Sequence, residues 1–273
     1  MMHEHVQEAE EILDKEYKVL CKGFLRLVDY MGSDERIVSA ARVSYRDSKA
    51  KRDSAGLIDY LIRNEHTSPL EQVVLTFHVK APIFVARQWM RHRTARINEV
   101  SGRYSVMREE FYVPSGGDIN KQSVTNKQGR SNVRVDEKTA ENLINNLEEH
   151  YKRSYKVYHD MVESDVSREI ARISLPLSLY TEWYWQIDLN NLFHFVKLRM
   201  SSHAQKEIRE YAILVLKIAE RVVPLATASF KNHILGGVML SKDELREIKR
   251  VLDLSRLHLS ELELKRLKEK LGL

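Results

Sequence analysis

Residues 87–104 concentrate side chains that can bind an anionic ligand and hydrogen-bond a base or a sugar. The stretch runs RQWMRHRTARINEVSGRY and combines five arginines with histidine, glutamine, asparagine, glutamate and serine. Arginine forks bind phosphate and carboxylate groups at two points, while Gln, Asn, Glu and Ser can contact the edge of a base or sugar. Gly102 lets the backbone approach a ligand closely because it has no Cβ. The stretch therefore predicts a site for a ligand that carries both phosphate and polar ring edges.

Two other interpretations of this stretch compete with a small-molecule site. Arg91-His92-Arg93 alone is more typical of a solvated basic helix end, where the helix dipole favours cations. A solvated face rarely needs Asn, Glu, Ser, Gly and Arg in close order, so the full stretch favours a site. A noncatalytic nucleic-acid-binding protein would contact phosphates with a steep salt dependence, but Glu99 and a net charge of only +5 argue against it. A nucleic-acid-binding protein of this kind would contact phosphates through Arg87, Arg91, Arg93, Arg96 and Arg103.

The composition indicates a folded, helix-rich protein. Of the 273 residues, 43% are hydrophobic and 30% are charged, which argues against wholesale disorder. The 10 glycines and 5 prolines favour long helices over a turn-rich all-β fold. We find no apolar run long enough to span a bilayer and no signal-peptide pattern, so we expect a cytoplasmic protein with no membrane partner.

Cysteine content limits the possible chemistry further. Cys21 is the only cysteine, so neither an intramolecular disulfide nor a Cys-based zinc site is expected, and no metal is predicted. Cys21 lies in the apolar stretch VLCKGFLRL, far from the polar clusters. We expect it to be a small buried hydrophobe and not a nucleophile.

Hydrophobic periodicity and capping residues predict an α+β protein dominated by helix. A capping-box pair, Ser202 and Gln205, is expected to open a helix whose apolar stripe runs to Val222. The polar segment 115–135 is expected to be a mobile loop. Strands are expected at 73–79, 111–113 and 179–185, and helices at 34–45, at 53–63, from Pro82 through Arg93, after residue 135, after Asp188, and in the charged C-terminal extension 242–273.

The motif Arg91-His92-Arg93, seven residues and then Ser101 resembles the signature of the flavin-dependent thymidylate synthases. The similarity continues through NEVSGRYS, upstream into HTSPLE, and downstream into ARISLPLSLYTEWYW and LRMSSHAQKEIREYA. It covers roughly residues 60–215 in the family's order, which is too broad for a chance match. The resemblance implies one helix-rich α+β domain over residues 1–273, built around a small antiparallel sheet as in thymidylate synthase-complementing proteins. It also implies a homotetramer whose active sites lie between subunits.

The resemblance implies reductive methylation of dUMP to dTMP. NADPH would reduce FAD, methylenetetrahydrofolate would supply the carbon, and the reduced flavin would supply hydride. Arg199 matches the arginine that favours ionisation of uracil N3, which makes it the implied catalytic residue. The implied FAD-binding residues are Ser68, Arg91, His92, Arg93, Glu99, Asp188, Asn190 and His194. The implied dUMP-binding residues are Gln88, Trp89, Met90, Arg91, Glu99, Val100, Ser101, Gly102, Arg103, Arg172 and Arg199.

Three of these positions depart from the family pattern. Where some members have Asn, Arg and Asn, this chain has Asp188, Asn190 and His194. A cation is lost and an acid gained near the flavin's pyrophosphate or adenine, so the detailed FAD contacts are expected to differ. On a helix from Asp188 these residues share one face and Arg199 lies roughly opposite, so one helix would serve two pockets. The chain has no GxGxxG fingerprint after a strand, which disfavours a Rossmann site.

Overall fold

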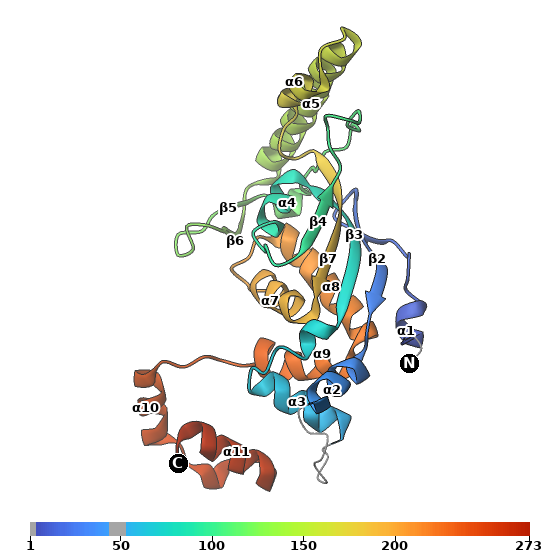
Figure 1. Ribbon diagram of the computed structural model, residues 1–273. Helices are drawn as coiled ribbons and strands as arrows, with labels where there is room; N and C mark the ends of the chain where they lie inside the picture. Colours follow the sequence, from blue (N-terminus) through green and yellow to red (C-terminus); the bar gives the residue numbers. More distant parts are fainter. Residues whose placement is uncertain (1–3, 44–52) are drawn as a thin grey trace.

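The computed structural model describes residues 4–43 and 53–273, and its centre is a five-stranded antiparallel sheet (Figure 1). The strand order is β1-β2-β3-β7-β4, so β3 lies in the middle. Alternate residues of β3, Leu75, Phe77 and Val79, are fully buried, as expected for a strand with one face against a core. The strands are β1 (Tyr17–Val19), β2 (Gly23–Met31), β3 (Val74–Pro82), β4 (Arg96–Glu99) and β7 (Tyr180–Asp188).

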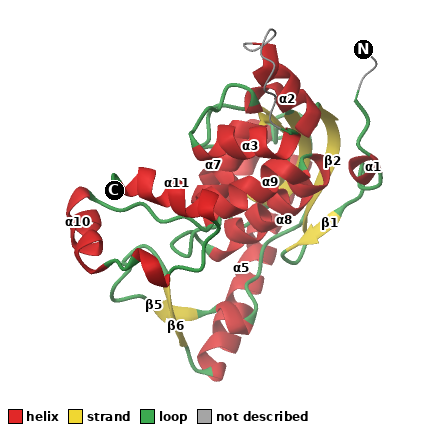
Figure 2. Ribbon diagram, turned by 90° about the horizontal axis from the view of Figure 1, so that it is seen from below, coloured by secondary structure: helices red, strands yellow, loops and turns green. Residues whose placement is uncertain are grey.

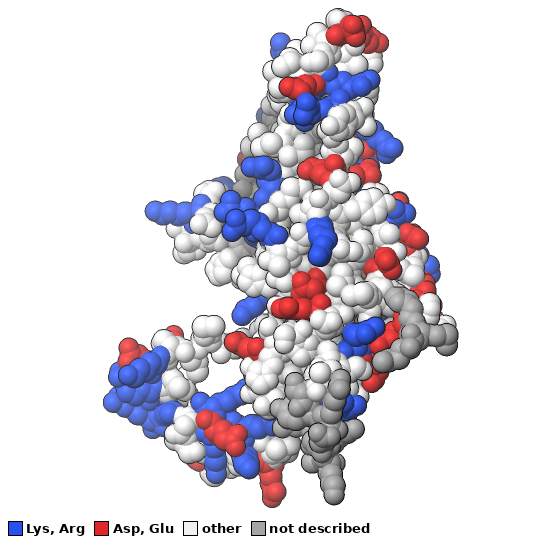
Figure 3. All heavy atoms as spheres, in the orientation of Figure 1, with Lys and Arg blue, Asp and Glu red and all other residues white. Residues whose placement is uncertain are grey.

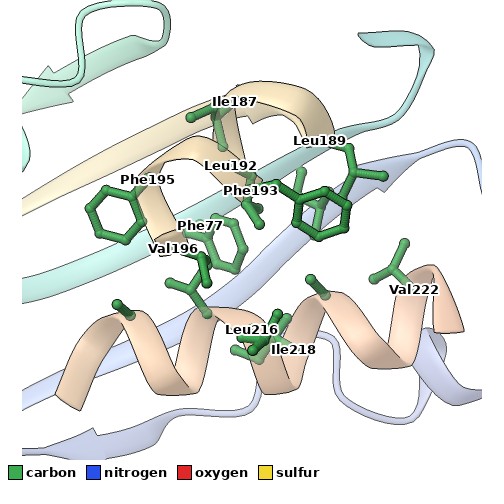
Figure 4. Close-up of a cluster of buried hydrophobic side chains, with 14 of the residues drawn as sticks. Phe77, Ile187, Leu189, Leu192, Phe193, Phe195, Val196, Leu216, Ile218 and Val222 are labelled. Carbon is green, nitrogen blue, oxygen red and sulfur yellow. The ribbon is translucent and has the colours of Figure 1, made fainter. Parts of the chain in front are cut away.

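Helices pack against the buried face of this sheet and complete the main core. Figure 4 shows side chains from β3, α7 and α8 meeting there, among them Phe77, Phe195 and Leu216. The helix α8 buries the predicted apolar stripe from Ile208 to Val222 along one side, because residues three and four apart share a helix face. The core helices are α2 (Asp34–Arg42), α3 (Ser54–Arg63), α4 (Ile83–Trp89), α7 (Leu189–Arg199), α8 (Lys206–Val222) and α9 (Pro224–Phe230).

The remaining elements extend outward from this centre. Figures 1 and 2 show the long helix α5 projecting away from the sheet and a two-stranded hairpin, β5–β6, lying to one side. The C-terminal helices α10 and α11 are joined to the core by an extended segment. These elements are α1 (Gln7–Glu10), β5 (Asn120–Gln122), β6 (Arg130–Arg134), α5 (Glu137–Glu163), α6 (Arg168–Ala171), α10 (Lys242–Val251) and α11 (Glu261–Leu271), with short helical turns at Leu70–Gln72, Gly116–Asp118, Arg172–Ser174, Lys231–Leu235 and Leu254–Arg256.

The α+β prediction is confirmed, and so are most of the predicted helices. Asp53 and Asp188 cap α3 and α7 with their side chains, at the positions where the helices at 53–63 and after Asp188 were predicted to begin. The helix predicted at 34–45 is capped by Ser33 and reaches Arg42, while residues 44 and 45 lie outside the described part. No helix in the described ranges is both long and apolar enough to cross a bilayer.

Several local predictions are wrong. The helix after Pro82 stops at Trp89, so the RHR motif follows the helix and does not lie on it. The segment 115–135 contains the β5–β6 hairpin, and residues 111–113 form only an isolated bridge through Phe111. The predicted capping box is absent, because α8 begins at Lys206 and the Gln205 side chain makes no cap hydrogen bond.

The predicted burial of Cys21 is also wrong. Its side chain is exposed in the turn between β1 and β2, two strands that the apolar stretch VLCKGFLRL did not suggest. Its Sγ lies 3.4 Å from the hydroxyl of Tyr180. Cys21 lies outside the core because it precedes β2, which begins at Gly23. The buried leucines of β2 are Leu25 and Leu27.

Candidate active site

Arg199, His92 and the backbone of Gln88 form a hydrogen-bonded cluster between the ends of α4 and α7. Nε of Arg199 donates to Nε2 of His92 at 3.0 Å, and Nη2 donates to the carbonyl oxygen of Gln88 at 3.1 Å. Arg199 is the last residue of α7, and His92 follows the end of α4. The fold thus joins two sequence motifs that are over a hundred residues apart.

The electrostatics of this cluster keep His92 neutral. Burial, together with the charges of Arg199 and His194, lowers the pKa of His92 from 6.5 to about 4. A neutral imidazole can accept the Arg199 hydrogen bond at Nε2, which leaves its proton on Nδ1. Burial and the nearby Arg91 cation also lower the pKa of Arg199. Arg199 nevertheless stays charged at neutral pH, because a guanidinium starts from so high a pKa.

A second contact ties Gln88 to the start of α8. Nε2 of Gln88 donates a short hydrogen bond to Oε1 of Gln205. The side-chain amide of Gln88 therefore donates to Gln205, and within the described residues its Oε1 accepts no hydrogen bond. Gln205 was not predicted as a site residue, although it stands in the LRMSSHAQKEIREYA segment that carries the family resemblance.

The other predicted residues of the RHR region differ in exposure. Arg91 and Arg93 are exposed, as a ligand-binding cation must be, and Met90 is half-buried against the main core. The side chain of Trp89 is fully buried and packs edge-on against Trp183 and Trp185 at 5.4 and 5.0 Å. A dUMP contact by the Trp89 side chain does not fit this position, because three indoles fill the space.

A cavity of about 400 Å³ lies beside α7 and is lined by two of the predicted flavin residues, Asn190 and His194. Its wall mixes apolar groups such as Phe193 with the polar residue Thr67, which precedes the exposed Ser68. Lys197 also lines it and is the one Lys or Arg among its described lining residues. Arg199 does not line this cavity and contacts His92 instead. This agrees with the expectation that α7 contributes residues to two different pockets.

Asp188, in contrast, is engaged in the helix itself. One carboxylate oxygen accepts from the backbone N–H of Asn191 at 3.0 Å, and the other accepts from its side chain at 2.7 Å. Both oxygens are therefore used to cap α7. A direct role of this carboxylate in flavin binding would require it to leave the cap.

A second group of predicted dUMP residues lies beyond β4. Gly102 is buried, and a Cβ there would come within 3.2 Å of Met107 Sδ and 3.4 Å of Arg172 Cδ, so a larger residue would require these side chains to shift. Arg103 pairs with Glu169 at 2.9 Å and its backbone N–H donates to the hydroxyl of Ser101. These residues and Arg172 form a basic cluster next to α6.

Two further predicted residues lie at the end of β4. Oε1 of Glu99 accepts from the hydroxyl of the buried Thr181 at 2.6 Å, which orients the carboxylate along the sheet edge. Val100 is exposed, and its backbone N–H donates to the carbonyl of Glu182 at 2.9 Å. No hydrogen bond or ion pair in the described parts of the chain links the Arg199 cluster to the Arg172 cluster. Among the described residues, the predicted dUMP residues therefore fall into two groups that share no hydrogen bond or ion pair.

The comparisons with known proteins agree with the resemblance. Residues 26–225 match the family model described as thymidylate synthase complementing protein. The chain is 57% identical to a flavin-dependent thymidylate synthase of Treponema denticola, over 95% of this chain and 98% of the relative. It is 55% identical to that of Borreliella burgdorferi, over 96% of this chain and 100% of the relative.

A solved structure is similar over most of the fold. It is the UMP/dUMP methylase PolB from Streptomyces cacaoi bound with 5-Br UMP, with a TM-score of 0.71 and 32% identity. The match covers 80% of this chain and 97% of the PolB chain. The match to the family model and the identity over nearly the full length together show that this chain belongs to the flavin-dependent thymidylate synthase family.

Proposed function

We propose that this protein methylates dUMP to dTMP, with FAD as hydride carrier, NADPH as reductant and methylenetetrahydrofolate as carbon donor. The observation that carries the proposal is the orientation of Arg199 by two acceptors, the neutral His92 and the Gln88 carbonyl. These contacts use Nε and Nη2, and within the described residues Nη1 has no hydrogen-bond partner. A fixed cation of this kind stabilises negative charge that develops on a bound ring, because it needs no rearrangement during the reaction.

The uracil ring is assigned to the space next to this guanidinium. Arg199 would favour ionisation at uracil N3, and the oxygen of the Gln88 amide would accept a hydrogen bond from the ring edge. His92 accepts a hydrogen bond from Arg199 as a neutral ring. It therefore orients the guanidinium and leaves its positive charge unpaired. The methylated species is then the uracil anion, and the fixed Arg199 cation stabilises its negative charge.

The cavity beside α7 fits part of FAD. Its apolar wall at Phe193 and Phe230, stacked with ring centroids 4.1 Å apart, suits an aromatic ring system. Lys197 supplies a cation for the phosphates, in a position where Asn190 and His194 supply hydrogen bonds. When bound, the flavin supplies the hydride chemistry, and the protein supplies orientation and charge.

A complete dUMP site would need two subunits. Within the described residues no hydrogen bond or ion pair joins the Arg199 cluster to the Arg172 cluster. Exposed apolar side chains surround the second cluster, with Tyr104 79% and Ile173 73% exposed. Exposed apolar surface of this kind is typical of a surface that a partner covers. We therefore propose a homotetramer of single-domain subunits in which the phosphate-binding Ser101, Arg103 and Arg172 face the uracil-binding residues of a neighbour.

One assay tests the proposed reaction. The purified protein is incubated with dUMP carrying tritium at C5, together with FAD, NADPH and methylenetetrahydrofolate. Tritium release with dTMP formation is expected, and each should require all three added compounds. A protein that binds FAD and dUMP but releases no tritium would not be the proposed enzyme.

A second measurement tests the shared site. Light scattering should give a tetramer, and FAD should lower the protein concentration at which it dissociates, because a ligand held between subunits favours the associated state. An active FAD-loaded monomer would contradict the assignment of Arg172 to a neighbouring site.

A further inference from the structure

A polar cavity of about 480 Å³ lies between the β5–β6 hairpin and the segment that joins α7 to α8. Neither side of it was assigned to FAD or to dUMP. Carboxamides line the hairpin side, and His203, Gln205 and Arg209 line the opposite side. Figure 3 shows basic side chains gathered over the hairpin on this face of the molecule.

The hairpin side of the cavity is held in place by a buried ion pair. Nη2 of Arg130 donates to both carboxylate oxygens of Glu207, at 2.6 and 2.7 Å, and the Glu207 side chain is only 4% exposed. The hydroxyl of Tyr112 donates to the same carboxylate at 2.9 Å. Burial alone would raise the pKa of Glu207, but the hydrogen bonds from Arg130 outweigh it and lower that pKa. The cavity therefore has a wall fixed before any ligand binds.

The charges around the cavity are unequally balanced. Arg130 is neutralised by Glu207, and Lys206 is neutralised by a short ion pair with Asp118. Arg209 makes no ion pair within the described parts of the chain, and the one hydrogen bond of its side chain there goes to the carbonyl of Ser202 at 3.4 Å. A cation without a counter-charge, set among hydrogen-bonding side chains, favours an anionic ligand.

The cavity also adjoins the proposed uracil site. Gln205 lines the cavity and accepts the hydrogen bond from the Gln88 side chain. A ligand that contacts Gln205 in the cavity would therefore be separated by this one side chain from the Gln88 amide, which is assigned to dUMP. This shared residue favours an occupant that is used in the same reaction over an unrelated effector.

We propose that this cavity binds the anionic end of a co-substrate, with Arg209 as its charged contact and the hairpin carboxamides as hydrogen-bonding partners. The proposal rests on the proposed function for the identity of the co-substrates. The anion is either a phosphate of the pyridine nucleotide or a glutamate carboxylate of the folate, since both place negative charge on a large hydrogen-bonding molecule.

Calorimetric titration separates the two sources. NADP⁺, tetrahydrofolate and dUMP are titrated separately into the FAD-loaded wild-type protein, Arg209→Gln and Arg209→Lys. One co-substrate should lose about tenfold in affinity for Arg209→Gln, the scale of one charge-assisted hydrogen bond. Arg209→Lys should recover part of that loss, while dUMP should bind all proteins equally. The matched control is Arg153→Gln on the exposed side of α5, which should change none of the three affinities.

The outcomes distinguish this proposal from the proposed function. Unchanged affinities for NADP⁺ and tetrahydrofolate in Arg209→Gln would overturn it, and so would a loss confined to dUMP. A parallel loss of all ligands without rescue by Arg209→Lys would also overturn it, because Arg209 would then be structural. Failure of the proposed function would appear in the wild-type protein itself, as absent tritium release.

Discussion

Nε of Arg199 donates a hydrogen bond to Nε2 of His92 over 3.0 Å, and this contact sets both the direction of the guanidinium and the tautomer of the imidazole. A protonated His92 could not accept this bond, and it would place a second cation next to Arg199. The lowered pKa of His92, about 4, results from burial and from the positive neighbours Arg199 and His194. The contact therefore orients the Arg199 guanidinium through a neutral acceptor and places no second positive charge beside it.

Arg199→Lys should reduce methylation of dUMP by about a hundredfold or more, the scale for one preorganised charge-stabilising donor. Lysine keeps the charge but cannot donate to His92 and Gln88 at once in the planar arrangement of the fork. Oxidation of NADPH by the FAD-loaded protein should survive better, since it needs no ionised uracil. Stopped-flow flavin reduction, measured beside dTMP yield, checks this. Equal loss of both half-reactions with loss of FAD would assign Arg199 to binding.

His92→Gln should make the stability of the protein less sensitive to acid. The folded-state pKa of His92 lies below its ordinary value of 6.5, so the unfolded chain binds the extra proton between pH 6.5 and about 4. Stability is therefore fully present above pH 6.5 and is lost as the pH falls towards 4. Thermal melts of the two proteins across this range should diverge, with the wild type losing more. Parallel curves would show that His92 is not buried as a neutral ring.

Lys197→Glu should weaken FAD by about tenfold or more and leave riboflavin binding unchanged, because riboflavin lacks the phosphates that Lys197 is assigned to contact. Fluorescence titration of both flavins measures this. Lys217→Glu, an exposed charge reversal on α8, is the matched control and should bind both flavins normally. Equal weakening of FAD and riboflavin by Lys197→Glu would mean that the residue shapes the cavity and does not bind phosphate.

Arg130→Met should lower the free energy of unfolding by about 3–5 kcal/mol, because it leaves the buried Glu207 carboxylate without its cation. The double variant Arg130→Met with Glu207→Leu should recover most of this loss, since no buried charge remains. Urea unfolding of the wild type, the single variants Arg130→Met and Glu207→Leu, and the double variant forms a complete cycle. A loss below about 1 kcal/mol in Arg130→Met would contradict this prediction, because an ion pair that contributes so little behaves as an exposed one.

Cys21→Ala should leave dTMP formation nearly intact. The residue is exposed at a turn, and hydride transfer from a flavin needs no thiolate nucleophile. The contact with the Tyr180 hydroxyl at 3.4 Å is weak, so stability should change little. Turnover of the variant with saturating substrates checks this. A large drop in turnover at unchanged stability would support a cysteine mechanism.

Much of the fold could be read from local pattern. Apolar residues three or four apart predicted α8, and the caps Asp53 and Asp188 predicted where α3 and α7 begin. These features depend on interactions within one turn or one helix face, so the sequence carries them directly. The edge strand β4 and the β5–β6 hairpin were missed because their residues are polar, and only pairing with other segments makes them strands.

The sequence by itself determined the family, the residue types of the site and the helix that carries Arg199. Only the tertiary structure decided that Trp89 is a core residue and that Gln205 holds Gln88. Each of these depends on contacts between segments that the sequence separates, such as α4 with α8. Motif spacing records which residues are present, but side-chain direction and burial follow from how the helices pack on the sheet.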